Sequence, residues 1–246
     1  MQSALFPLRI VNLEPSDLNS LDCQYFGRAD DNCEYAIKTA DTHADLPATE
    51  WICHWLASAC GIHTPQVNVL ILPNGTKAFG SKWEGGVENT SSNALVLLND
   101  VVEDGIEDSL SSIFAFDYFV WNIDRHLGNY LLQKARRSTR IVAIDFSRSL
   151  FCSRWPAPES AMPYNCNTVQ VLRALKSART FNLAAANLTL DRIEQIPHDE
   201  LNQAVHGLPS DWLSNARKEQ FCRWWKSDSR QRVSYLRKGL KNGSLF

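Results

Sequence analysis

The chain has 246 residues, enough for one large domain or two smaller lobes with buried cores. Apolar residues make up 44% of it, with 8 Trp and 11 Phe, and this composition excludes a disordered chain. The formal charge is −2, from 25 basic and 27 acidic residues, so the chain has no overall attraction to nucleic acid. We therefore expect a globular protein that does not have nucleic acid as its partner.

The 7 cysteines are an odd number and include no Cys-x-x-Cys pair. Cys53, Cys60 and His63 lie near one another in sequence, but no fourth ligand follows at the spacing of a zinc finger. We expect these thiols to pack in the core as small apolar groups. The apolar stretch 113–121 is too short to span a bilayer, so we expect a cytoplasmic protein with no membrane partner.

The first third of the chain predicts a small β-rich unit with one helix. Strand-like runs occur at residues 4–13, 21–26, 33–39, 67–72 and 77–83. Asn74-Gly75 separates the last two runs and predicts a hairpin, because both residues accept positive φ. Residues 46–60 predict a helix, with Asp45 as its N-cap and Gly61 after its end.

After Trp83 the composition becomes helical. Glu84-Gly85-Gly86 predicts a hinge. Residues 109–121 are apolar almost all round, which is typical of a helix buried in a core. Residues 211–225 and 228–241 predict two further helices near the end of the chain. Trp224 and Trp225 are able to stack on nucleotide bases, but we expect them to pack against the other helices.

The segment around Asp124, Asn129 and Asp145 carries the chemistry. Residues 130–133 and 141–144 predict two strands joined by a polar turn centred on Arg137, and this register places Asn129 opposite Asp145. An amide oxygen and a carboxylate held together in this way can bind one Mg²⁺ ion. Asp124, in the loop before Asn129, is then free to face an acceptor hydroxyl, as phosphoryl transfer requires.

The first third contains further parts of such a site. Tyr35-Ala36-Ile37-Lys38 predicts a strand that ends in a lysine, and Glu50 lies in the next helix. A kinase uses a strand lysine on the phosphates of ATP and a helix glutamate to hold that lysine. Residues 27–31 form the expected nucleotide loop, in which Asp30 and Asp31 would repel phosphates unless they point away.

The motif Asn122-x-Asp124-Arg125-His126-x-x-Asn129, followed by Ile144-Asp145, resembles the catalytic and metal-binding signature of HipA-like kinases. It is also similar to the Asp-Arg-His-x-x-Asn element of phosphatidylinositol kinases. The resemblance implies a catalytic segment made of the base Asp124 with Arg125 and His126 supporting its loop, Asn129 and Asp145 on Mg²⁺, and Lys38 on the nucleotide phosphates.

The resemblance also implies an α+β fold of the two-lobed protein-kinase type. Its small, mainly-β N-lobe would span residues 1–84, and its larger helical C-lobe residues 85–246. ATP would lie between the lobes. The expected nucleotide-binding residues are Lys38, Glu50, Ser81, Lys82, Trp83 and Glu84.

The function implied by the resemblance is that of an ATP- and Mg²⁺-dependent serine/threonine protein kinase, with a protein acceptor favoured over a small molecule. Two alternatives stay open: a small-molecule or lipid-headgroup kinase, and a nucleotide-binding pseudokinase that acts through a protein partner. The chain is shorter than full-length HipA toxins, so their antitoxin–operator partnership is not implied. A regulatory protein partner stays open.

Overall fold

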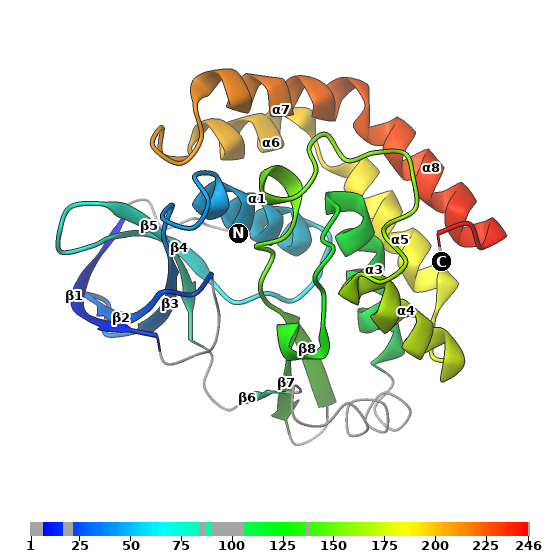
Figure 1. The fold of residues 1–246 in the computed structure, drawn as a ribbon, viewed down its shortest axis with the longest axis horizontal. Coiled ribbons are helices and arrows are strands. Elements are labelled where there is room, and N and C mark those ends of the chain that lie inside the picture. The colour runs from blue at the N-terminus through cyan, green and yellow to red at the C-terminus, as the bar shows by residue number, and fades with distance from the viewer. Residues whose placement is uncertain (1–6, 17–21, 84–86, 90–105, 136–137, 246) are drawn as a thin grey trace.

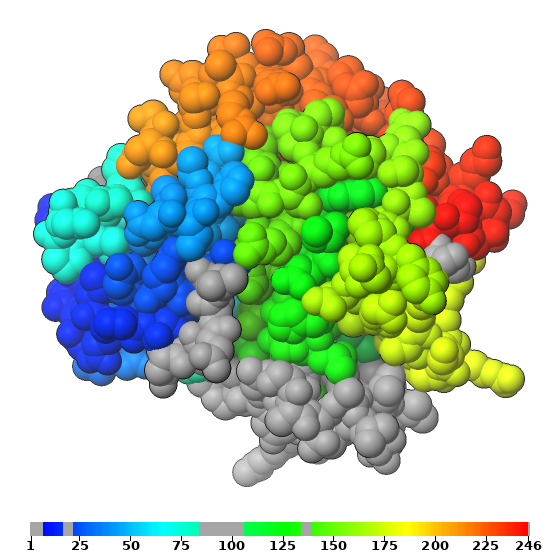
Figure 2. Space-filling view, in the orientation of Figure 1, coloured from blue at the N-terminus to red at the C-terminus, as the bar shows by residue number. Residues whose placement is uncertain are grey.

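The chain forms a mixed α+β fold, with a β-barrel at one end and a group of helices at the other (Figure 1). This computed structural model describes residues 7–16, 22–83, 87–89, 106–135 and 138–245. Blue residues of the barrel and green residues of the catalytic segment lie side by side on the face shown in Figure 2. The α+β class expected from the sequence is confirmed.

Five strands close into a barrel in the order β1-β2-β3-β5-β4. Their bounds are β1 (Leu8–Pro15), β2 (Tyr25–Ala29), β3 (Glu34–Lys38), β4 (Val67–Ile71) and β5 (Lys77–Lys82). Neighbouring strands are antiparallel except β1 and β4, which pair in parallel at Leu8–Leu70 and Arg9–Ile71. Each of the five predicted runs overlaps a strand, but β2 lies later than the predicted run at 21–26 and includes residues 27–29. Their closure into a barrel is not something the apolar runs predict, because it depends on the pairing of strands far apart in sequence.

Helix α1 (Leu46–Ala59) lies between the barrel and the other helices (Figure 1). It begins beside Pro47, whose fixed φ suits the first turn. Ile52 and Leu56 are buried in the core. Asp45 is the N-cap residue, as predicted, but its side chain makes no capping hydrogen bond. The Asp45 carboxylate pairs instead with Arg217.

The other helices of the described residues are α3 (Glu107–Val120), α4 (Asn167–Ser177), α5 (Leu183–Gln195), α6 (His198–His206), α7 (Asn215–Ser227) and α8 (Ser229–Asn242). The helices predicted at 109–121, 211–225 and 228–241 correspond to α3, α7 and α8. Trp224 and Trp225 lie 6.0 and 5.7 Å from the ring of Phe119 and pack inside, as expected. No helix in this described part of the chain is long and apolar enough to cross a bilayer.

A second sheet joins β6 (Val87–Asn89), β7 (Tyr130–Ala135) and β8 (Ser138–Ala143), all antiparallel. The hairpin of β7 and β8 was predicted, and β6 was not. Because β7 follows directly on the catalytic motif, this sheet fixes where the motif ends. The predicted hinge at residues 84–86 lies outside the described residues.

Candidate active site

The catalytic loop starts where α3 ends. Trp121 has φ 58°, in the left-handed region, and turns the chain away from the helix axis. Asn122 then donates through its backbone N–H to the carbonyl oxygen of Asp117 (2.8 Å) and through Nδ2 to Oδ1 of the same residue (2.9 Å). Asp117 is fully buried. These bonds hold the first residue of the loop against the core.

Arg125 is the buried support of the loop. Its Nε lies 2.7 Å from Oδ2 of Asp117 and its Nη2 3.0 Å from Oδ1, a bidentate pair with side chains at most 1% exposed. Burial by itself lowers the pKa of Arg125, but the Asp117 carboxylate more than offsets this and raises it. Nη1 donates to the carbonyl oxygens of Asn129 and Ile144. Arg125 therefore ties α3, the loop and the hairpin together and does not face the open site.

Asp124 is the carboxylate that faces outward. It is partly exposed. Its Oδ1 accepts a hydrogen bond of 2.5 Å from Nδ2 of Asn167, at the start of α4. Its carbonyl oxygen accepts one of 3.0 Å from Nδ2 of Asn129. The carboxylate is thus held in position while its remaining oxygen is free of protein hydrogen bonds in the described part of the chain.

The next residue of α4 clamps the loop from the same side. Oγ1 of Thr168 donates to the carbonyl oxygen of Asn122 (2.5 Å) and accepts from the backbone N–H of Arg125 (3.0 Å). Sequence reasoning missed both Asn167 and Thr168. The only local signal was an Asn-Thr pair before an amphipathic stretch, which indicates a helix start but not a contact with the loop.

The hairpin differs from its predicted register by one residue. Asn129 faces Ile144, whose N–H donates to the Asn129 carbonyl oxygen (3.1 Å), and it does not face Asp145. The prediction is wrong because the connection holds an even number of residues, 136–137, rather than an odd number centred on Arg137. A slip of one residue reverses the face on which a strand side chain lies.

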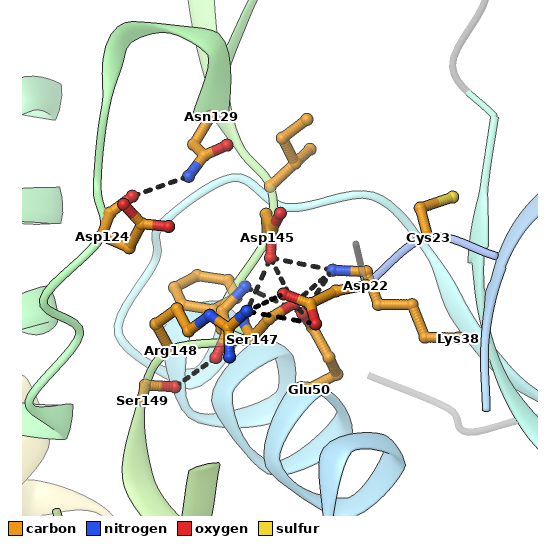
Figure 3. Close-up of polar contacts among 12 residues, drawn as sticks. Asp22, Cys23, Lys38, Glu50, Asp124, Asn129, Asp145, Ser147, Arg148 and Ser149 are labelled. Carbon is orange, nitrogen blue, oxygen red and sulfur yellow. Dashed lines mark hydrogen bonds and ion pairs between the residues drawn. The ribbon is translucent and has the colours of Figure 1, made fainter. Parts of the chain in front are cut away.

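The backbone conformation of Asp145 changes the direction of its side chain despite the one-residue difference in register. Asp145 has φ 59°, so the chain leaves the strand there and the carboxylate turns toward Lys38. Because Nδ2 of Asn129 is bonded to Asp124, its Oδ1 points the opposite way, toward the side on which Asp145 lies (Figure 3). Asn129 thus contacts Asp124 on one side and has Asp145 on the other, and a metal site shared by Asn129 and Asp145 stays a prediction.

Lys38 is at the centre of a buried polar cluster (Figure 3). Its Nζ lies 2.6 Å from Oε1 of Glu50, 2.8 Å from Oδ1 of Asp145 and 2.8 Å from Oγ of Ser147. The side chain of Lys38 is 8% exposed, that of Glu50 is 0% exposed, and that of Asp145 is 29% exposed. The predicted pairing of the strand lysine with the helix glutamate is present in the structure.

Ser147 completes this cluster and was not predicted. Its Oγ lies 2.9 Å from Oε1 of Glu50 and 2.5 Å from Oδ1 of Asp145. The backbone N–H of Phe146 also donates to Oε1 of Glu50 (3.0 Å). The segment after the metal-ligand candidate thus supplies hydrogen-bond donors to both carboxylates. A serine two residues after an aspartate is too common a pattern to signal this role.

The charges of the cluster shift its pKa values strongly. Burial lowers the pKa of Lys38, but Asp145 and Glu50 outweigh this effect and raise it. Burial raises the pKa of Asp145, but Lys38 and the Ser147 hydrogen bonds hold it well below its ordinary range. For Glu50 burial is the larger effect and raises its pKa against the charge of Lys38. Lys38 and Asp145 are therefore an ionised pair at neutral pH.

The oxygens that remain fit a magnesium ion. One lysine faces two carboxylates in this cluster, and the one whose pKa is lowered, Asp145, is the partly exposed one. Oδ2 of Asp145 and Oδ1 of Asn129 make no hydrogen bond to another described residue. Mg²⁺ takes hard oxygen ligands, commonly one or two from protein and the rest from phosphate and water. Within residues that the structure describes, no group of three His, Cys, Asp or Glu side chains forms a protein-only metal site.

The other predicted site residues lie at the edges of this arrangement. His126 is exposed, and its Nδ1 accepts from the N–H of Gly128 (3.1 Å), so it caps the short turn Leu127–Asn129. Ser81 pairs with Ala36, two residues before Lys38 in β3 and so about 7 Å along the strand. Glu84 lies outside the described residues.

Two further candidates lie at the end of β5. Lys82 pairs with Tyr35 across the barrel sheet, farther from Lys38 than Ser81 is. Trp83 is 51% exposed and packs edge-to-face on Phe26, with 5.2 Å between ring centroids. Both lie on the side of the barrel that leads into the second sheet.

The predicted nucleotide loop, residues 27–31, is wrong in its place. Residues 27–29 belong to β2, and the turn with Asp30 and Asp31 lies at the end of the barrel opposite Lys38. Asp31 accepts hydrogen bonds from Cys33 N (2.9 Å) and Tyr35 Oη (2.8 Å). The end of the barrel that carries Lys38 instead receives the β1–β2 connection, which includes Asp22. The repulsion of phosphates by two turn acids does not arise.

Comparisons with known proteins agree with this geometry. Residues 19–234 match a family model described as HipA-like kinase. Among solved structures, the proinflammatory kinase CtkA of Helicobacter pylori aligns over 96% of this chain and 97% of its own, with a TM-score of 0.63 and 14% identity. The HipA toxin of Shewanella oneidensis MR-1, solved with HipB and operator DNA, aligns over 93% of this chain and 65% of its own, with a TM-score of 0.50 and 12% identity. No curated protein sequence matches the chain.

Proposed function

The chain belongs to the HipA-like kinase family, and from that premise we propose that it is an ATP- and Mg²⁺-dependent phosphotransferase acting on a serine or threonine of a protein. The family and the kinase structures of similar fold support a kinase. The acceptor class is carried over from the family resemblance. We propose further that residues 1–84 and 85–246 act as the two lobes of one kinase domain.

One observation carries the proposal: the Lys38–Asp145 ion pair, which joins the barrel to the segment after the hairpin. The two residues are 107 positions apart along the chain. Glu50 holds the lysine from α1, and Asn129 donates a hydrogen bond to the carbonyl oxygen of Asp124 in the catalytic loop. Lysine, glutamate, base, asparagine and aspartate are the parts from which phosphoryl transfer is built.

Each residue has a distinct task in the proposed reaction. Lys38 binds phosphate oxygens, and Glu50 keeps it aimed. Asn129 and Asp145 would hold Mg²⁺, which would supply charge stabilisation on the phosphates. Asp124 accepts a hydrogen bond from the acceptor hydroxyl and takes its proton as the new P–O bond forms, while the bond from the γ-phosphorus to the bridging oxygen of ATP breaks and ADP leaves. Arg125 does not touch the reactants and acts by positioning the loop.

The structure bears differently on the two alternatives, a pseudokinase and a small-molecule kinase. The pseudokinase alternative depended on Asp30 and Asp31, which would repel phosphates in the expected nucleotide loop. Both residues lie at the far end of the barrel from Lys38, so they no longer favour that alternative. A small-molecule acceptor would use the same residues, because the kinase core does not fix the acceptor. We favour the protein acceptor on the family resemblance.

The proposal is tested by measuring ADP release and self-phosphorylation of the purified chain with Mg·ATP and with EDTA. Asp145→Asn keeps the shape of the side chain but removes its charge, and we expect turnover to fall at least about a hundredfold. Asp30→Asn is the matched control, since this aspartate is exposed at the far end of the barrel. Nucleotide binding without turnover in the presence of acceptor proteins would favour the pseudokinase. An absence of nucleotide binding would contradict the whole proposal.

A further inference from the structure

A second basic side chain reaches toward the Lys38 cluster. Arg148 follows Ser147, and its Nη2 lies 3.2 Å from Oδ2 and 3.5 Å from Oδ1 of Asp22 (Figure 3). Asp22 belongs to the connection between β1 and β2, on the Lys38 end of the barrel. The ion pair thus bridges residues 126 positions apart, beside the candidate phosphate site.

The backbone of Arg148 is fixed while its side chain is accessible. Its carbonyl oxygen accepts a hydrogen bond of 3.2 Å from the N–H of Ile123, in the catalytic loop. Its neighbours Ser147 and Ser149 are 2% and 0% exposed. The Arg148 side chain itself is 40% exposed, and that of Asp22 is 12% exposed. A guanidinium on a rigid base can change partners without moving the loop.

Binding a triphosphate at this site requires positive charge in addition to that of Lys38. Lys38 already contacts two carboxylates, so the cluster cannot by itself offset the negative charge of a triphosphate. Arg125 is buried against Asp117 and does not reach the open site. An arginine is suited to phosphate, because its planar fork of donors matches two phosphate oxygens. Arg148 is the exposed member of the pair and Asp22 the buried one, so the guanidinium is the group that can turn to an incoming phosphate.

We propose that Arg148 binds a terminal phosphate group of the nucleoside triphosphate, and that Asp22 holds the same guanidinium when no nucleotide is present. Asp22 and the phosphate then compete for Arg148. The inference rests on the proposed kinase function and adds a binding residue to it. The exchange breaks no covalent bond.

If Asp22 and phosphate compete for Arg148, substitutions of the two residues should change the Kd of Mg·ATP in opposite directions. Arg148→Ala removes a charge-assisted bond to phosphate, and we expect the Kd of Mg·ATP, measured by calorimetry, to rise about ten- to a hundredfold. Asp22→Asn removes the competitor while keeping its shape, and we expect that Kd to fall several-fold. If the pair only braces the structure, both variants break the same contact and both raise the Kd. Arg148→Lys should recover part of the loss, and adenosine, which has no phosphate, should bind all of these variants as it binds the wild type.

The Arg217–Asp45 ion pair provides the matched control. Its side chains are 38% and 12% exposed, almost the values of the Arg148–Asp22 pair. We expect Arg217→Ala and Asp45→Asn to leave the Kd of Mg·ATP within about twofold of the wild type. A rise of the Kd in both Asp22→Asn and Arg148→Ala, or no change in either one, would overturn the competition. Wild-type protein that binds no Mg·ATP would instead overturn the proposed function.

Discussion

Nδ2 of Asn167 lies 2.5 Å from Oδ1 of Asp124, although 43 residues separate them along the chain. The contact brings the first turn of α4 to the proposed catalytic base. A carboxylate that accepts a fixed hydrogen bond on one oxygen presents the other in a defined direction. The residues after the catalytic motif are therefore part of the site and not only a support for it.

We expect Asn167→Ala to lower kcat about tenfold while leaving the Kd of Mg·ATP unchanged, since one hydrogen bond that orients the base is lost. Both constants are measured on the same preparation. Asn187→Ala is the matched control, because Nδ2 of Asn187 bonds only to its own helix, at the carbonyl oxygen of Leu183. An equal loss of nucleotide affinity in Asn167→Ala would show that this residue supports the fold instead.

Asp124→Asn should lower kcat far more, by about a hundred- to ten-thousandfold, because the amide cannot take the proton of the acceptor hydroxyl. Nucleotide affinity should change little, since no contact joins Asp124 to the Lys38 cluster in the described part of the chain. Calorimetry with Mg·ATP and a turnover assay separate the two effects. A rise in Kd as large as the fall in kcat would contradict a role as base.

Ser147→Ala should destabilise the fold by about 1–3 kcal/mol, because the buried Lys38 ammonium loses an acceptor and the one hydroxyl proton shared between Glu50 and Asp145 is lost. The free energy of unfolding is measured by urea denaturation. Ser227→Ala serves as control, since Ser227 is exposed. A difference of less than a few tenths of a kcal/mol between the two variants would mean that Ser147 does not brace the cluster.

Arg125→Ala should destabilise the fold by about 3–5 kcal/mol, because it leaves the Asp117 carboxylate buried without its partner. Arg28→Ala breaks an exposed pair with Glu34, whose side chains are 57% and 60% exposed, and should cost less than about 1 kcal/mol. Thermal or urea unfolding measures both. Similar losses in the two variants would argue against Arg125 as the buried support of the loop.

The stability of the fold should fall with acid because of His54. Its Nδ1 bonds to the carbonyl oxygen of Glu50 (2.9 Å), its Nε2 is buried without a partner, and burial lowers its pKa to about 3. Between pH about 6.5 and 3 the unfolded chain therefore binds a proton that the folded chain does not. Stability contributed by the neutral ring is full above pH about 6.5 and is lost as the pH falls, by up to about 1.4 kcal/mol per pH unit.

Urea unfolding between pH 7 and 5 checks this expectation. In His54→Gln the slope of the unfolding free energy against pH should be smaller by that amount, whatever the absolute stability. His206→Gln is the control, since the exposed His206 makes the same kind of bond to a backbone carbonyl four residues earlier (2.9 Å). Identical slopes in the wild type and His54→Gln would show that His54 does not titrate in this way.

Much of the site was predictable because its parts are local patterns. The spacing of Asp124 and Asn129 and the strand ending at Lys38 depend on residues within one turn or strand, and the structure brings them together. The hairpin register was not predictable to one residue, because it depends on the turn length. The positive φ of Asp145 compensates for that error, and nothing in the residue type alone signals it.

What the sequence could not reveal are contacts made only by the folded chain. Asn167 reaches Asp124, and Arg148 reaches Asp22, across separations that no periodicity records. The barrel closes through a short parallel pairing of β1 and β4, which also lies beyond local patterns. Helices α4 to α6 were not placed either, although α5 begins at Asn182, whose Oδ1 accepts hydrogen bonds from the backbone N–H groups of Ala184 and Ala185.

Under the proposed function, the three contacts of Lys38 would make the affinities for metal and nucleotide interdependent. In this structure its ammonium neutralises Asp145. Phosphates that draw the ammonium away expose the full charge of that carboxylate to a cation, and a cation on Asp145 in turn releases the ammonium toward the phosphates. We therefore expect each of the two ligands to improve the binding of the other by the same factor, as thermodynamic reciprocity requires. Either one alone has to compete with an ion pair that the fold already contains.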